Sequence, residues 1–302
     1  MRIFLTGATG YIGSAVMDSL LRSGHEVTAL VRDPEKAEQV SGRGVHPIVG
    51  ELSKPASYAA AAETADAIVH TALESSKRTA KVDRQAIETL LAAAGRRAVA
   101  GLPASLVYTS GTWVLGEVQD ATEDTPVNPI SLVAWRPDHE QLVLDAARDG
   151  IRPVVIRPGI VYGGARGIVG DLLKDAANGL VRVVGTGKNR WACIYDRDLA
   201  DLYVRVSTMD DAAGVFHAND EADEAVKDIV AAIAHHAKVP PDVRHMPIEE
   251  ARKKIGPYAD ALALDQIVRS PRARALGWAP TLRSVAGSVA RLLEEYRTAR
   301  AA

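Results

Sequence analysis

The chain has 302 residues, of which 47% are hydrophobic and 25% are charged, and its formal net charge is -2. This profile is typical of a globular protein with one large domain, or with a large domain and a small one. It offers no excess of positive charge that would bind nucleic acid or an anionic membrane surface.

The single cysteine, Cys193, has no partner for a disulfide and excludes a cysteine-based metal centre, so we expect no metal site. No uninterrupted apolar run in the sequence reaches the length of about 18 residues that a membrane span requires. The short run before the first glycine cluster does not resemble a secretory signal, so we expect none. We therefore expect a soluble, cytoplasmic protein that binds a small molecule.

Short apolar runs alternate with helical patterns through the first half of the chain. The apolar runs indicate buried strands of a parallel sheet at Arg2–Leu5, Val27–Val31, His46–Val49, Ala67–Thr71, Leu106–Thr109 and Val154–Arg157. Helical patterns separate them at Ile12–Ser23, near Ser57–Glu63, at Asp83–Ala94 and at Asp138–Ala147. This alternation predicts an α/β fold with a doubly wound parallel sheet of the Rossmann type.

The alternation ends after about Gly163, where glycine and charged residues become denser. Helical patterns return at Asp223–Ala237, Ile248–Ile255 and Thr281–Arg297. We expect residues 1–163 to form a dinucleotide-binding domain. Residues 164–302 are expected to complete the sheet and to form a small, interleaved C-terminal cap.

The first predicted strand leads directly into the segment Thr6-Gly7-Ala8-Thr9-Gly10-Tyr11-Ile12-Gly13, which opens a predicted helix. In this spacing Gly7 makes the sharp turn, Gly10 lets the backbone approach a pyrophosphate, and Gly13 lets the helix pack on the strand. Free amides at the start of the helix face the anion. The segment predicts a nicotinamide dinucleotide site that includes Gly7, Thr9, Gly10, Tyr11, Ile12 and Gly13.

The end of the second predicted strand indicates which dinucleotide binds. An acidic residue at this place usually holds the ribose hydroxyls of NAD, whereas an arginine suits the 2′-phosphate of NADP. Arg32 offers a planar fork of donors for a phosphate, and Lys36 adds positive charge. We predict NADP(H) as the cofactor. NAD(H), with Asp33 on the ribose, is the alternative.

Further motifs resemble those of the extended short-chain dehydrogenase/reductase superfamily, in its NAD(P)-dependent epimerase/dehydratase group, from Met1 to about Leu293. They are Gly50-Glu51-Leu52, Val69-His70-Thr71-Ala72, Arg157-Pro158-Gly159-Ile160-Val161-Tyr162-Gly163, Asp196-Arg197-Asp198-Leu199-Ala200 and Leu276-Gly277-Trp278-Ala279-Pro280. The resemblance implies further cofactor contacts at Glu51, Leu52, Thr71, Ala72, Thr109, Pro158, Gly159 and Val161.

The family's acid/base chemistry relies on a Ser or Thr and on a Tyr-x-x-x-Lys pair, and this sequence departs from the pattern at all three positions. The usual hydroxyl position falls on Gly111, and the tyrosine and lysine positions fall on Leu132 and Arg136. Leucine cannot transfer a proton, whereas arginine can hold ribose hydroxyls but stays charged. No tyrosine lies between Tyr108 and Tyr162, so the missing tyrosine does not depend on the alignment.

Four side chains are candidates to replace the missing acid, each with a structural alternative. Ser110 and Thr112 flank the altered hydroxyl position, and either can equally form a turn hydrogen bond. Tyr162 also occurs in relatives with a complete triad, which favours a structural role. His139 follows Arg136 by three residues and so shares its helix face, although a surface histidine is more common. From these four we take Ser110, Thr112 and Tyr162 as catalytic candidates, and we add Arg136 at the family's lysine position.

Other aromatic and basic residues bear on the substrate. Trp113 and Trp135 flank the two altered motifs, where they either line an apolar pocket or pack in a core. Arg182, Lys188 and Arg190 surround a glycine turn, in the region where sugar-nucleotide relatives hold the substrate diphosphate. The alternative for these three is a solvated surface cluster.

Together these features predict an NADP(H)-dependent oxidoreductase that acts on a small carbonyl or alcohol, with non-standard proton delivery. One alternative is a sugar-nucleotide epimerase or dehydratase, which the overall resemblance suggests. A second alternative is a redox sensor that binds NADP(H) without turnover. The sequence leaves open whether the helices near Asp83–Ala94 and Asp138–Ala147 form a homodimer, as they commonly do in relatives.

Overall fold

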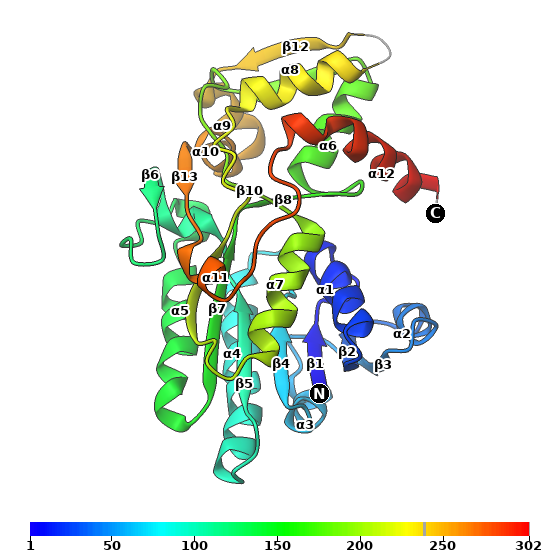
Figure 1. Ribbon diagram of the computed structural model, residues 1–302, viewed down its shortest axis with the longest axis vertical. Helices are drawn as coiled ribbons and strands as arrows, with labels where there is room; N and C mark the ends of the chain where they lie inside the picture. The colour runs from blue at the N-terminus through cyan, green and yellow to red at the C-terminus, as the bar shows by residue number, and fades with distance from the viewer. Residues whose placement is uncertain (238–239, 302) are drawn as a thin grey trace. The chain divides into compact units, whose positions relative to one another are not determined.

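The computed structural model describes residues 1–237 and 240–301 (Figure 1). The chain folds into two compact units whose segments alternate along the sequence. Unit 1 consists of Met1–Ser110, Trp135–Arg157 and Leu199–Phe216. Unit 2 consists of Gly111–Ala134, Pro158–Asp198 and His217–Ala302.

A seven-stranded sheet carries unit 1, in the order β11-β7-β5-β4-β1-β2-β3. Its strands are β1 (Arg2–Thr6), β2 (Glu26–Val31), β3 (His46–Val49), β4 (Ala67–His70), β5 (Ser105–Thr109), β7 (Arg152–Pro158) and β11 (Gly214–Ala218). The pairs from β3 through β7 are parallel, which confirms the predicted doubly wound sheet. Strand order reverses at β1, the point at which open α/β sheets bind ligands beyond the carboxyl ends of their strands.

Helices cover both faces of this sheet (Figure 1). They are α1 (Tyr11–Arg22), α2 (Pro34–Ser41), α3 (Ala59–Glu63), α4 (Thr79–Val99), α5 (Arg136–Asp145) and α7 (Asp196–Thr208), with 3₁₀ turns η1 (Pro55–Ser57) and η4 (Ala146–Asp149). One face packs against α3, α4 and α5 through a continuous apolar core that includes Phe4, Ile87 and Val143. On the other face α1 and α7 lie side by side, joined by a 2.8 Å hydrogen bond from Ser19 Oγ to Asp201 Oδ1.

Unit 2 is built from short elements around its own apolar core. They are η2 (Thr112–Leu115), β6 (Val118–Ala121), η3 (Ser131–Val133), β8 (Ile160–Tyr162), α6 (Gly167–Ala177), β9 (Leu180–Val184), β10 (Cys193–Tyr195), α8 (Val226–His236), β12 (Asp242–Met246), α9 (Ile248–Ile255), α10 (Tyr258–Ala263), β13 (Gln266–Val268), α11 (Pro271–Ala275), η5 (Ala286–Ser288) and α12 (Val289–Ala301). The strands form three parallel pairs, β8 with β10, β9 with β12, and β6 with β13.

Three predicted helix starts are wrong. The helix expected from Asp83 already begins at Thr79. The helix expected from Thr281 begins only at Val289, because the backbone amides of Thr281 and Leu282 donate to the Asp198 carboxylate, at 2.9 and 3.0 Å. The helix expected from Asp223 begins at Val226, because Asp223 has a left-handed φ of 54°.

Among the described residues, no helix is both long and apolar enough to cross a membrane.

Candidate functional site

The glycine turn between β1 and α1 has the shape of an anion cradle. Gly7 has a φ of 80°, and a Cβ there would lie 2.7 Å from the Ala72 nitrogen, so a larger residue does not fit. A Cβ on Gly13 would lie 2.0 Å from the Gly7 carbonyl oxygen. Gly10 is the N-cap of α1, and no side chain caps this end of the helix. Backbone amides at the start of α1 can therefore bind a pyrophosphate, together with the neighbouring Thr9, Tyr11 and Ile12.

The end of β4 is fastened to the start of this turn. Thr71 Oγ1 donates to the Thr6 carbonyl oxygen at 2.7 Å, and the Ala72 amide donates to Thr6 Oγ1 at 3.3 Å. These two bonds bring Thr71 and Ala72, predicted to contact the cofactor, to the edge of the glycine turn. The cradle is therefore held on two sides, by β1 and by β4.

The tip of β2 presents a free cation. Arg32 is exposed, and its side chain forms no hydrogen bond or ion pair with any described residue. Asp33, by contrast, is the N-cap of α2, and its Oδ1 accepts a 2.8 Å hydrogen bond from the Lys36 amide. The carboxylate is thus turned toward its own helix, while the guanidinium remains available to a ligand.

Glu51 and Leu52 follow β3 and lie in a locally bonded loop. The Glu51 amide donates to Ser57 Oγ at 3.2 Å, and the Leu52 carbonyl oxygen accepts from the Tyr58 hydroxyl at 3.2 Å. Lys54 pairs with Glu51 at 2.8 Å, and its hydrogen bond lowers the pKa of that carboxyl. The loop leaves Leu52 partly exposed beside the end of β3.

Arg136 is the first residue of α5, and one end of its guanidinium is fixed. Its Nη1 donates to the Thr109 carbonyl oxygen at 2.9 Å and to the Tyr108 hydroxyl at 3.1 Å. The guanidinium carbon lies 4.5 Å from the centroid of the Trp135 ring. The other two nitrogens, Nε and Nη2, donate to no described residue. A half-buried guanidinium with two unused donor nitrogens can hold the two hydroxyls of a ribose.

Thr109 ends β5 on the opposite face from Tyr108. Its Oγ1 donates to the His70 carbonyl oxygen at 2.8 Å and therefore accepts the 2.6 Å hydrogen bond from the Tyr203 hydroxyl. These bonds hold β5 against β4 and α7 at the carboxyl ends of the strands. The Thr109 carbonyl oxygen, which receives Arg136, is thereby fixed as well.

His139 is buried, and it binds a residue that sequence reasoning missed. Its Nδ1 lies 2.7 Å from Oδ2 of Asp83, which also accepts a 2.9 Å hydrogen bond from the Tyr108 hydroxyl. His70 Nε2 lies 3.4 Å from the other oxygen of Asp83. Burial opposes ionisation, but the hydrogen bond with His139, the nearby His70 and the charge of Arg136 lower the pKa of Asp83. The available signal was an acidic residue within the mostly apolar buried face of α4, which also includes Arg97.

The hydroxyl candidates have different surroundings. Ser110 follows β5 and is buried, and its Oγ has no hydrogen-bond partner among the described residues. Thr112 belongs to unit 2, where it is 2% exposed and its carbonyl oxygen accepts from Gln266 Nε2 at 2.8 Å. Tyr162 of unit 2 is fully buried, and its hydroxyl donates to the Leu282 carbonyl oxygen at 3.2 Å. Burial raises the pKa of the Tyr162 hydroxyl. The Ser110 hydroxyl has unused hydrogen-bonding capacity.

The segment after Arg157 lies in unit 2 and approaches other backbone closely. The Gly159 amide donates to the Ala218 carbonyl oxygen at 3.1 Å, and a Cβ on Gly159 would lie 2.4 Å from the Ala192 carbonyl oxygen. Val161 pairs with Ile194 in the β8–β10 ladder. The contacts predicted for Pro158, Gly159 and Val161 with the nicotinamide remain predictions.

In the basic cluster of unit 2, Arg190 is neutralised by its neighbours. It forms a forked ion pair with Asp265, with Nε 2.9 Å from Oδ1 and Nη2 2.6 Å from Oδ2, and it also donates to Gln119. Arg182 and Lys188 are exposed. The partly exposed guanidinium is thus paired with protein side chains rather than left free for an anionic ligand.

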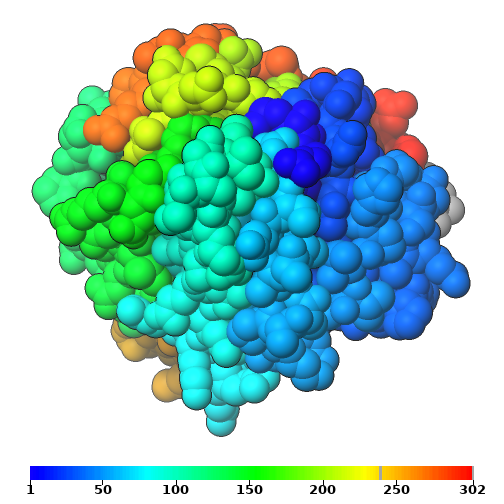
Figure 2. Space-filling model, turned by 90° about the horizontal axis from the view of Figure 1, so that it is seen from below, coloured from blue at the N-terminus to red at the C-terminus, as the bar shows by residue number. Residues whose placement is uncertain are grey.

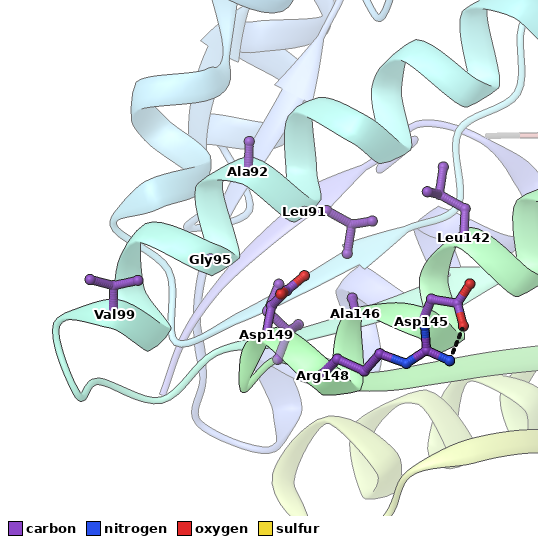
Figure 3. Close-up of a pocket in the computed structure, with 10 residues that line it drawn as sticks. Leu91, Ala92, Gly95, Val99, Leu142, Asp145, Ala146, Arg148 and Asp149 are labelled. Carbon is purple, nitrogen blue, oxygen red and sulfur yellow. Dashed lines mark ion pairs between the residues drawn. The ribbon is translucent and has the colours of Figure 1, made fainter.

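A separate hollow of about 570 Å³ lies on unit 1 (Figure 3). It is lined by Leu91, Ala92, Gly95, Val99, Leu142, Asp145, Ala146, Arg148, Asp149 and Ile151. Ile151 directly precedes β7, so the hollow lies at the amino end of that strand, whereas the glycine turn follows the carboxyl end of parallel β1. The end of α4 and the loop after it face the viewer in Figure 2. This surface is therefore distinct from the dinucleotide cradle.

Comparisons with known proteins agree with the fold. The model of the NAD dependent epimerase/dehydratase family matches residues 3–218. An uncharacterized protein of Schizosaccharomyces pombe is 31% identical, over 93% of this chain and 95% of its own length. A 4-hydroxy-2-methyl-3-oxo-4-farnesyl-3,4-dihydroquinoline-1-oxide ketoreductase of Stigmatella aurantiaca is 32% identical, over 54% of this chain and 51% of its own length.

Among solved structures, the UDP-glucose 4-epimerase of Thermus thermophilus in complex with NAD is similar, with a TM-score of 0.81 and 21% identity. The match covers 99% of this chain and 100% of that one. The family match spans the glycine turn, the tip of β2 and the helix that carries Arg136. The chain therefore belongs to the NAD-dependent epimerase/dehydratase family.

Proposed function

We propose that this protein is an NADP(H)-dependent oxidoreductase that acts on a small carbonyl or alcohol. The observation that carries the cofactor assignment is the contrast at the tip of β2. Arg32 is exposed and unpaired among the described residues, whereas Asp33 is engaged as the cap of α2. A 2′-phosphate would meet a donor fork there, whereas the carboxylate that usually accepts from the ribose hydroxyls has one oxygen, Oδ1, engaged by the Lys36 amide.

The residues of unit 1 fit a dinucleotide along its length. The amides after Gly7 would hold the pyrophosphate, Arg32 the 2′-phosphate, and the two unused nitrogens of Arg136 the hydroxyls of the second ribose. When bound, the cofactor supplies or accepts the hydride. The protein then has to move a proton to or from the substrate oxygen.

For that proton we propose a hydroxyl, because no tyrosine occupies the family's position. Ser110 Oγ is buried without a partner among the described residues, so it can donate a hydrogen bond to a substrate oxygen. Serine does not ionise near neutral pH, so the proton must come through it from water or a ribose hydroxyl. Thr112 is the second candidate for this role.

Carbonyl reduction is supported by the ketoreductase relative from Stigmatella aurantiaca, which is 32% identical over 54% of this chain. The sugar-nucleotide alternative is disfavoured by Arg190, since Asp265 and Gln119 occupy a guanidinium suited to a diphosphate. A redox sensor without turnover remains the alternative that the missing tyrosine favours. Turnover with any carbonyl substrate would distinguish the oxidoreductase from the redox sensor.

We also propose that the hollow on α4 and α5 receives a second copy of the chain. Small residues at Ala92, Gly95 and Ala146 allow helices to approach closely, and Val99 beside them is 91% exposed. The occupant is a homodimer partner, in keeping with the family resemblance.

The direct test is to titrate ligand-free protein with NADPH and NADH, following the fluorescence of the reduced nicotinamide. We expect NADPH to bind at least tenfold more tightly, about 1.4 kcal/mol. Tighter binding of NADH would overturn the cofactor assignment, and binding of neither would overturn the function. Bound NADPH is then exposed to a panel of small ketones, where Ser110→Ala is expected to slow oxidation of the cofactor without changing its Kd.

A further inference from the structure

We propose that Asp83 is a positioning residue for the cofactor, because it holds the guanidinium of Arg136 in place through the hydroxyl of Tyr108. The same carboxylate lies 3.4 Å from Nε2 of His70, whose Nδ1 is hydrogen-bonded to Thr6, the residue that precedes the glycine turn. The inference rests on the proposed function, since it takes Arg136 as the side chain that holds a ribose of the dinucleotide. All of these residues belong to unit 1.

The link to Arg136 runs through one oxygen atom. The Tyr108 hydroxyl donates its proton to Asp83 Oδ2 at 2.9 Å, which leaves its lone pairs to accept from Arg136 Nη1 at 3.1 Å. Asp83 thus fixes the direction of the Tyr108 hydroxyl. A hydroxyl proton turned the other way would meet the N–H of the guanidinium. The Thr109 carbonyl oxygen alone would then hold Nη1.

His70 lies between Asp83 and the residue before the glycine turn. Thr6 Oγ1 accepts from the Ala72 amide at 3.3 Å and is hydrogen-bonded to His70 Nδ1 at 2.6 Å. His70 Nε2 lies 3.4 Å from Asp83 Oδ1 without a hydrogen bond between them. The hydrogen-bonded link from Asp83 is therefore the one to Tyr108 and Arg136.

The carboxylate is a stronger acceptor than its amide. Asp83 is 3% exposed, and its Oδ2 accepts from Tyr108 and contacts His139 Nδ1 at 2.7 Å. An asparagine offers these two side chains a single neutral oxygen, which accepts more weakly than a charged carboxylate. Asp83→Asn therefore weakens the hold on the Tyr108 hydroxyl, and through it the position of Arg136.

The test compares two ligands in the variant Asp83→Asn. NADPH contains the second ribose, whereas adenosine 2′,5′-bisphosphate contains the adenosine and the 2′-phosphate but lacks that ribose. We expect Asp83→Asn to raise the Kd of NADPH about tenfold and to leave the Kd of the bisphosphate within about twofold. Tyr108→Phe removes only the hydroxyl and is expected to do the same, which covers a failure of Asp83→Asn to fold.

The matched control is Asp66→Asn. Asp66 precedes β4 at the other end of the strand from His70, and it pairs with Arg97 at 2.8 Å. Loss of the Asp66 carboxylate tests whether general destabilisation of unit 1 weakens binding. The Kd values of NADPH and of the bisphosphate are both expected to stay within about twofold of the wild type. A second control is the double variant Asp83→Asn with Arg136→Ala, where the effect of Asp83→Asn on NADPH is expected to disappear because Asp83 acts through Arg136.

The outcomes separate the two proposals. If the wild-type protein binds neither ligand, the proposed function fails, and this inference fails with it. If the wild type binds both and Asp83→Asn weakens both equally, or weakens neither, the positioning role is refuted while the cofactor assignment stands. The positioning role is also refuted if Asp83→Asn raises the Kd of NADPH as much in the Arg136→Ala background as it does in the wild type.

Discussion

The charge at the tip of β2 makes the sharpest prediction. Arg32→Ala removes a side chain that has no partner among the described residues, so the fold loses nothing and the ligand-binding effect can be measured cleanly. Hydrogen bonds to charged groups contribute about 1.5–3 kcal/mol. Because Arg32 is exposed and its charge is screened by solvent, we expect the lower end, about 1.5 kcal/mol. This corresponds to a Kd for NADPH that is about tenfold higher.

The assay is a parallel fluorescence titration with NADPH and NADH at low and high salt. NADH lacks the 2′-phosphate, so its Kd is expected to stay within about twofold, and the difference between the variants is expected to shrink as salt rises. Arg22→Ala, which removes an exposed arginine from the last turn of α1, controls for the change in net charge. Equal weakening of NADPH and NADH, or no weakening of either, would refute the assignment of Arg32 to the 2′-phosphate.

Four more outcomes follow from single positions. Asp33→Asn retains an N-cap side chain and is expected to leave NADH binding unchanged and to tighten NADPH slightly; a tenfold loss of NADH affinity would instead give Asp33 the ribose. Gly13→Ala places a Cβ 2.0 Å from the Gly7 carbonyl oxygen, and a urea titration is expected to show a loss of about 1–3 kcal/mol of stability together with weaker dinucleotide binding. Burial raises the pKa of Asp220 to about 7, so its protonation stabilises the folded state fully below about pH 4 and this contribution is lost as the pH rises through 7. Between pH 5 and 8 the wild type should therefore lose about 2–3 kcal/mol more than Asp220→Asn in urea titrations, and equal losses would show that Asp220 does not titrate in this way. Ala92→Glu places a charge in the hollow on α4, and light scattering is expected to show a dimer for the wild type and a monomer for the variant, with a wild-type monomer contradicting the proposed dimer.

The parts of the fold that could be predicted depend on local patterns. Apolar runs located every strand from β1 to β7 that belongs to the main sheet, with His46–Val49 matching β3 at both ends. The spacing of Gly7, Gly10 and Gly13 predicted the turn, because at each of the three positions a Cβ would lie too close to neighbouring atoms. Helix starts were less predictable where a distant carboxylate holds the backbone, as Asp198 holds Thr281.

The environment of the candidate site depended on contacts between distant parts of the sequence. Asp83, Tyr108 and His139 come from α4, β5 and α5, and no spacing rule joins them. The sequence therefore suggested an exposed His139, whereas the structure buries it. Arg190 was predicted as one of three basic residues around a glycine turn, and its partner Asp265 lies 75 residues further along the chain. Electrostatic pairing of this kind becomes visible only once the fold brings the charges together.

The alternation of the two units has a consequence for synthesis on the ribosome. Unit 1 is complete only when Leu199–Phe216 has been added, although Met1–Ser110 already holds most of its sheet. While Pro158–Asp198 is being made, the early part lacks β11 beside β7 and lacks α7 beside α1 on one face of the sheet. Nascent chains shorter than 216 residues should accordingly remain open to proteases and bind chaperones, even though the dinucleotide cradle is among the first structures encoded.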